Sequence, residues 1–99
     1  MDLSDWLDQH TSQAPSALRG RVKELALAAS ANTRATRLSR AGQAALDRVL
    51  SHSGDRSAAL DLLAADALIT LALHSQAQDA PELLEEFATS VLRASRQAP

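Results

Sequence analysis

One segment in the second half of the chain limits the fold more than any other feature. Residues Ala58–Leu73 read AALDLLAADALITLAL, and a helical projection of this run places leucines on every side. A helix that is apolar all round must be surrounded by protein. We therefore predict that this segment is either the central helix of a bundle or is shared between one chain and a second copy of it.

The composition favours helices throughout the chain. The 99 residues include 21 alanines and 17 leucines, but only three glycines, three prolines and two aromatic side chains. Alanine and leucine lose little side-chain entropy in a helix, whereas strands favour β-branched and aromatic residues. We predict an all-α fold, a compact bundle in one domain over residues 1–99, with four main helices and a short N-terminal helix.

Capping and turn residues predict where the helices begin and end. The expected elements are a short helix over about 3–10 with a linker to 14, helices over about 15–29, 34–50, 55–78 and 79–94, and a frayed tail over 95–99. Asp2 and Asp55 are expected to cap the first and fourth helices. Ser51–Gly54 is the clearest turn, and Asp79 is expected to cap the fifth helix.

Asp66 is the least expected residue of the apolar helix, because it lies among leucines and alanines. A buried carboxylate must be paired or neutralised, so an arginine such as Arg40 or Arg48 is expected opposite it. Thr70 and His74 follow one and two turns later and extend a polar seam along the helix. The seam is interpreted either as a ligand-binding site or as a buried ion pair that sets the register of the helices.

No catalytic or metal-binding motif stands out. Asp61 lies about 140° around the helix from Asp66, so the two acids do not converge. Asp61 is expected to be solvated or to be stabilised by the helix dipole. His10, His52 and His74 share no metal-ligand spacing, and the chain has no cysteine. Glycine-rich phosphate loops and serine-nucleophile motifs are absent from the sequence too. We expect no metal and no cofactor.

Three arginines recur at every third position where the third helix is expected to begin: Arg34, Arg37 and Arg40. Cations oppose the dipole at a helix N-terminus, so a contact with an anion or with an acidic partner is one interpretation. A solvated face paired with nearby acids is the other. The net charge of −2 argues against nucleic-acid binding by bulk charge.

The apolar surplus of the fourth helix suggests a function. The first hypothesis is a non-enzymatic helical protein that acts through protein–protein contacts as a homodimer. The residues expected in the core or interface are Leu60, Leu62, Leu63, Ile69, Leu71, Leu73 and Phe87. The alternatives are a carrier or sensor of a small apolar ligand with a pocket beside Asp66, and a small nucleic-acid-associated regulator.

The sequence also bears on location. The N-terminal decapeptide is acidic and does not resemble a signal or transit peptide. The longest uncharged apolar run, Ala67–Leu73, is shorter than the ~20 residues that cross a bilayer. We therefore expect a cytoplasmic protein with no membrane contact.

Overall fold

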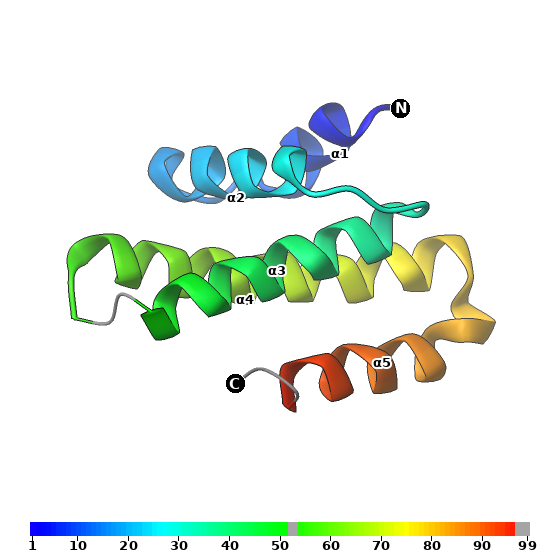
Figure 1. The fold of residues 1–99 in the computed structure, drawn as a ribbon. Coiled ribbons are helices and arrows are strands. Elements are labelled where there is room, and N and C mark those ends of the chain that lie inside the picture. Colours follow the sequence, from blue (N-terminus) through cyan, green and yellow to red (C-terminus); the bar gives the residue numbers. More distant parts are fainter. Residues whose placement is uncertain (52–53, 97–99) are drawn as a thin grey trace.

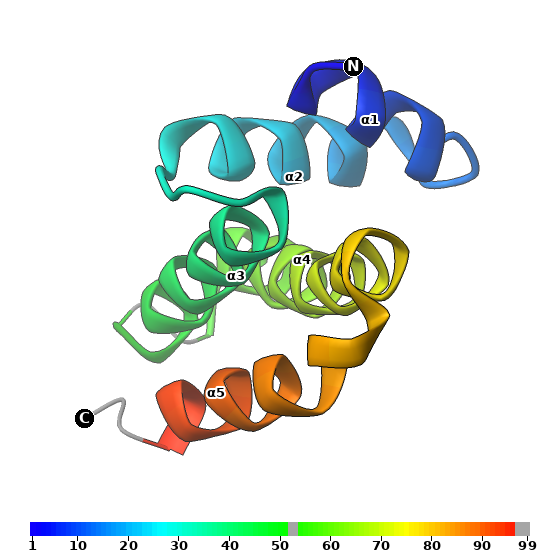
Figure 2. The ribbon, with the colours of Figure 1, turned by 90° about the vertical axis from the view of Figure 1, so that its right-hand side faces the viewer.

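An antiparallel pair of helices, α3 and α4, forms the middle layer of the fold (Figure 1). The computed structural model describes residues 1–51 and 54–96, the last two as backbone only. The elements in chain order are α1 (Leu3–His10), α2 (Ser16–Ala28), α3 (Arg34–Ser51), α4 (Arg56–Asp79), the 3-10 turn η1 (Pro81–Leu83) and α5 (Leu84–Arg96). α1 and α2 cover one side of the pair, and α5 crosses the other side (Figure 2).

The predicted all-α bundle is confirmed. The described residues form helices and connecting turns without a strand, and the Cα radius of gyration is 12.9 Å. A compact domain of 100 residues has a radius of about 13 Å. His52 and Ser53 of the predicted turn, and residues 97–99 of the predicted tail, lie outside the described residues.

Asp2 and Asp55 cap the N-termini of α1 and α4, as the sequence predicts. Oδ1 of Asp2 and Oδ1 of Asp55 each accept a hydrogen bond from the backbone N–H three residues later, at 2.8 and 2.7 Å. The prediction for the fifth helix is wrong, because Ala80 precedes η1 and no side chain caps that turn. Asp79 instead ends α4, and its carboxylate pairs with Arg34 at 2.9 Å.

Small residues bring α3 and α4 close together. The buried residues of the two helices that belong to the core cluster are Leu38, Ala41 and Ala45 of α3 and Ala64, Ala65, Leu68 and Ala72 of α4. Gly42 is also buried, and a Cβ atom at this position would lie 2.8 Å from Cδ1 of Ile69. The same Cβ atom would lie 3.4 Å from the carbonyl oxygen of Ala65. Gly42 therefore marks a close approach of α4 to α3.

Replacing Gly42 by alanine tests this close approach. Alanine stabilises a helix by about 1 kcal/mol relative to glycine. The added methyl group overpacks the contact with Ile69, which lowers the free energy of unfolding by about 1–3 kcal/mol. We expect Gly42→Ala to lower the free energy of unfolding by about 1 kcal/mol in urea titrations.

Gly20 provides the matched control, because it lies in α2 and a Cβ atom there would meet no atom within 4 Å. Gly20→Ala is expected to raise the free energy of unfolding by about 0.5–1 kcal/mol. Equal effects of the two substitutions would contradict the close approach at Gly42.

A buried ion pair joins α2 to α4. The Nε atom of Arg21 donates to Oδ1 of Asp61 at 2.6 Å, and the side chain of Asp61 is only 6% exposed. Nε of Arg48 lies 3.9 Å from the other carboxylate oxygen. The hydrogen bond to Asp61 raises the pKa of Arg21 above its ordinary value, so this guanidinium keeps its charge throughout the physiological range.

The expectation that Asp61 is solvated is therefore wrong. Asp61 lies on the same face of α4 as Ala64, Leu68 and Ala72, and this face is buried. Asp66 points the other way and is exposed, so the expectation of a buried Asp66 is wrong as well. Arg48, one of the two arginines named as possible partners of Asp66, instead lies beside Asp61.

Removing the Asp61 carboxylate tests the ion pair. Asp61→Ala leaves the largely buried charge of Arg21 without its shortest contact, so we expect the free energy of unfolding to fall by about 3 kcal/mol. Glu24 is the matched control, because it pairs with the same Arg21 at 3.1 Å but is exposed. Glu24→Ala is expected to change stability by less than about 0.5 kcal/mol in the same titration. Comparable losses in the two variants would contradict the assignment.

Candidate functional site

Trp6 attaches the N-terminal helix to the rest of the bundle. Its side chain is buried with Leu7 on the inner face of α1. Its Nε1 atom donates to Oε1 of Gln78 at 3.3 Å, and the guanidinium carbon of Arg34 lies 4.5 Å from the centre of the ring. Nε of Arg34 also donates to the buried Ser75 at 2.8 Å. Trp6 thus holds α1 against the start of α3 and the end of α4.

Two histidines lie beside Trp6. The ring of His10 stacks on Trp6 with 3.9 Å between centroids and 19° between planes. The ring of His74 lies 5.2 Å from His10 and 6.4 Å from Trp6, again between centroids. We call Trp6, His10, Arg34 and His74 the aromatic cluster. The sequence did not predict it, because no local spacing relates a residue of α1 to a residue near the end of α4.

The predicted polar seam of Asp66, Thr70 and His74 lies on the exposed side of α4. Asp66 and Thr70 line a depression of about 500 Å³ together with His10 and the connection between α1 and α2. His74 is not part of that lining and instead meets the ring of His10. The depression is open to solvent, so it does not enclose an apolar ligand. Ligand binding at these three residues stays a prediction.

The predicted arginine face caps the end of α2. Nε of Arg37 donates to the carbonyl oxygens of Ala26 at 3.1 Å and Ala29 at 2.8 Å, and its NH2 atom donates to Leu27 O at 3.2 Å. NH1 of Arg40 donates to the carbonyl oxygen of the next residue, Ser30, at 2.8 Å. Cations are favourable at a helix C-terminus, where the last carbonyl groups lack helical partners.

The structure thus gives each of the three arginines a partner inside the chain, since Arg34 binds Asp79 and Ser75. Arg40, the other arginine expected opposite Asp66, is among them. These contacts explain why cations stand where the dipole of α3 alone would disfavour them. Contact of this face with an external anion stays a prediction, and no observation favours it.

Truncating Arg37 tests the cap on α2. Hydrogen bonds from charged donors contribute about 1.5–3 kcal/mol, so we expect Arg37→Ala to lower the free energy of unfolding by about 2 kcal/mol. Exposed Arg19, on α2 itself, supplies the control, and Arg19→Ala is expected to change stability by less than about 0.5 kcal/mol. If Arg37→Ala lowers the free energy of unfolding by less than about 0.5 kcal/mol, the cap does not stabilise the fold.

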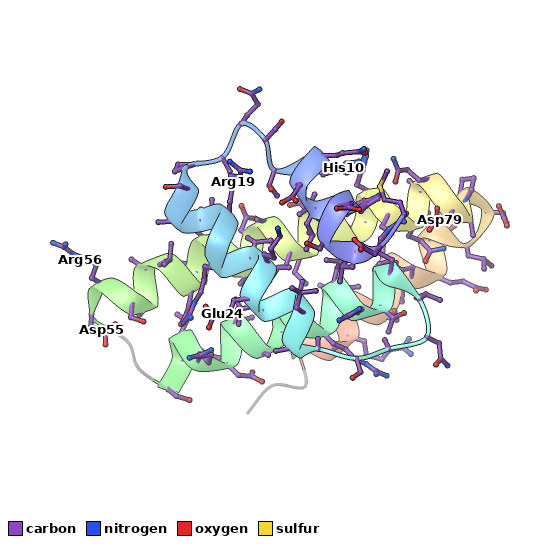
Figure 3. All side chains as sticks on the ribbon, turned by 90° about the horizontal axis from the view of Figure 1, so that it is seen from above. His10, Arg19, Glu24, Asp55, Arg56 and Asp79 are labelled. Carbon is purple, nitrogen blue, oxygen red and sulfur yellow. The ribbon has the colours of Figure 1, made fainter. Side chains whose placement is uncertain are left out.

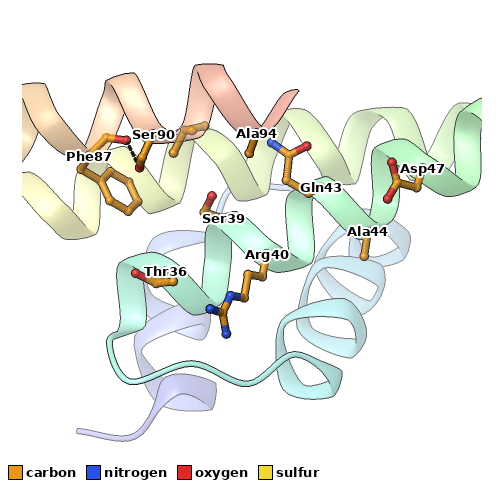
Figure 4. A pocket seen from close by; sticks show the side chains of 10 residues that line it. Thr36, Ser39, Arg40, Gln43, Ala44, Asp47, Phe87, Ser90 and Ala94 are labelled. Atoms are coloured by element: carbon orange, nitrogen blue, oxygen red, sulfur yellow. Dashed lines mark hydrogen bonds between the residues drawn. The ribbon is translucent and has the colours of Figure 1, made fainter. Parts of the chain in front are cut away.

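A groove of about 390 Å³ runs between α3 and α5 (Figure 4). Ser39 and Gln43 extend toward α5, whereas Arg40 extends away from it (Figure 4). Phe87 and Val91 form the apolar wall, and the hydroxyl of Ser90 donates to the carbonyl oxygen of Phe87 at 2.7 Å. The described residues that line the groove include no histidine that could act as a base for these hydroxyls.

Part of α4 is left exposed by the other described helices. Leu62 and Leu63 on α4 are 52% and 56% exposed. The other residues predicted for the core or interface are half-buried: Leu60, Ile69, Leu71, Leu73 and Phe87. The expectation that protein surrounds this helix therefore does not hold within one copy of the chain.

Four exposed residues of α4 share one face at spacings of three, four and three: Arg56, Ala59, Leu63 and Asp66. We call these residues the outer face of α4. Arg56 projects away from the bundle at the end of the helix (Figure 3). By length and composition, α4 is also the one described helix that could cross a membrane, although core helices of soluble proteins meet the same criterion.

The fold and these surfaces define a small all-α bundle with an aromatic cluster at one end of α4 and an uncovered apolar surface at the other. Neither a family model, nor a curated protein, nor a solved structure matches the chain. Among the described residues, no group of three or more histidine, aspartate or glutamate side chains is arranged to hold a metal ion.

Proposed function

We propose that this protein is a non-enzymatic helical bundle that acts through protein–protein contacts and assembles as a homodimer through the outer face of α4. The observation that carries the proposal is the exposure of Leu63 on this face and of Leu62 beside it. Isolated exposed leucines are common, but adjacent ones on a helix with no covering element favour an interface.

The outer face of α4 is complementary to itself. When two copies of α4 pack antiparallel with Ala59 opposite Leu63 of the second copy, two-fold symmetry also places Leu63 opposite the second Ala59. The same symmetry places Arg56 of each copy opposite Asp66 of the other. The pairing therefore sets a large side chain against a small one at the centre and opposite charges at both ends. This complementarity favours a second copy over an unrelated partner.

The interface is expected to be weak. The outer face spans only about three helical turns, so the area buried per copy falls below the roughly 800 Å² of a standard interface. We expect monomer and dimer to exchange with concentration. As part of the same proposal we expect a cytoplasmic protein in which a second copy of the chain, rather than a membrane, covers the outer face.

Light scattering over about 10 µM to 1 mM protein tests the dimer. The wild-type mass is expected to rise toward twice the 10.5 kDa of one chain. Leu63→Glu places two unpaired carboxylates at the centre of the interface, so this variant is expected to remain monomeric. Leu27→Glu changes another exposed leucine, on α2, and is expected to associate like wild type. If the wild-type mass is still that of one chain at about 1 mM protein, the proposal is wrong.

Charge exchange tests the antiparallel register. Arg56→Asp and Asp66→Arg each create two like-charge contacts in the dimer, so each is expected to weaken association about tenfold. The double variant Arg56→Asp with Asp66→Arg restores both pairs and is expected to associate like wild type. If the double variant associates more weakly than either single variant, this register is wrong. The Leu63→Glu variant would still test whether the chain forms a dimer through this face.

A further inference from the structure

We infer that His10 and His74 form a two-imidazole binding site for a divalent first-row transition metal such as Zn²⁺. The site lies in the aromatic cluster and joins α1 to α4. It is separate from the outer face of α4 and does not depend on the proposed dimer. Three features support it: the distance between the rings, the hydrogen bond of His10 and the accessibility of His74.

The distance between the rings fits metal coordination. Imidazole nitrogen binds zinc at about 2.0–2.1 Å, and a ring nitrogen lies about 1.1 Å from the ring centre. Two imidazoles that bind one ion at the tetrahedral angle therefore have their ring centres about 5 Å apart. The centroids of His10 and His74 are 5.2 Å apart, with the rings tilted by 59°. The separation of the ring centres therefore matches the one that a shared ion requires.

The hydrogen bond of His10 leaves one nitrogen free to bind. Nδ1 of His10 lies 2.8 Å from the carbonyl oxygen of Trp6. A carbonyl only accepts hydrogen bonds, so Nδ1 carries the proton and the lone pair of the neutral ring is on Nε2. Metal-binding histidines commonly donate their second N–H to a backbone carbonyl, which fixes the tautomer and the orientation of the ring. The stacking of His10 on Trp6 restricts the ring further.

The surroundings allow an ion to enter. His74 is exposed, and its ring nitrogens form no hydrogen bond within the part of the chain that the structure describes. The open depression lined by Asp66 and Thr70 reaches His10 and leaves room for water molecules. Because no third histidine or carboxylate of the described residues converges there, water would complete the coordination. The site is therefore expected to exchange its metal readily and to prefer metals that bind imidazole nitrogen.

Thermal unfolding of the untagged protein with ZnCl₂ tests the site. An ion that binds only the folded chain raises Tm, and we expect a rise of a few degrees that EDTA reverses. His10→Gln and His74→Gln are each expected to weaken Zn²⁺ binding at least about tenfold in calorimetry. His52→Gln removes the remaining histidine of the sequence and is expected to bind like wild type.

Tryptophan fluorescence gives a second measurement. Trp6 is the only tryptophan of the chain, and there is no tyrosine, so the emission reports on the aromatic cluster alone. Paramagnetic Ni²⁺ held by His10 is expected to quench this emission, and quenching at the same concentrations should disappear in both His10→Gln and His74→Gln. Equal Zn²⁺ affinity and equal Ni²⁺ quenching in wild type and the two variants would overturn the inference, as would the absence of any Zn²⁺ effect on wild type.

Discussion

The close approach of α3 and α4 is the contact on which the other elements depend. Gly42 and a series of alanines bring the two helices together, and this pair forms most of the interior. The outer helices then need only a few large side chains each, such as Trp6 and Leu7 of α1 or Val22 and Leu25 of α2. A chain with few aromatic residues can build one core in this way. Small side chains allow the helix backbones to pack closely, so the backbones themselves fill space that large side chains would otherwise occupy.

The helices themselves were largely predictable, but the orientation of α4 about its own axis was not. Helix positions follow from composition and from caps such as Asp2 and Asp55. A helix with leucines on every side carries no amphipathic signal, so nothing local distinguishes the face of Asp61 from the face of Asp66. Only the packing of α2 and α3 decides that Asp61 is buried beside Arg21. The sequence therefore predicts a buried Asp66 and a solvated Asp61, whereas Asp61 is the buried acid and Asp66 the exposed one.

The candidate sites depended on contacts between distant parts of the chain. From the sequence, Arg37 appears only as a cation opposed to the dipole of its own helix. In the structure its side chain donates to the carbonyl groups at the end of α2. The connection between α2 and α3 brings these groups beside Arg37. The meeting of His10 with His74 depends on how α1 docks, and docking follows from the burial of Trp6 rather than from any spacing between histidines. Only the surplus of apolar surface on α4 could be read locally, because it is a property of one helix.

The thin attachment of α5 has a consequence for the dynamics of the bundle. Among its described side chains only Val91 is buried, while Leu84 and Phe87 are half-buried. Phe87 lies beside a partly polar stretch of α3. An element that contributes so little to the interior opens at a lower free energy than the whole domain unfolds. We therefore expect α5 to detach at a lower free energy than the other two layers need to unfold. Its detachment would expose the α3 surface around Ser39 and Gln43 to solvent and to other molecules.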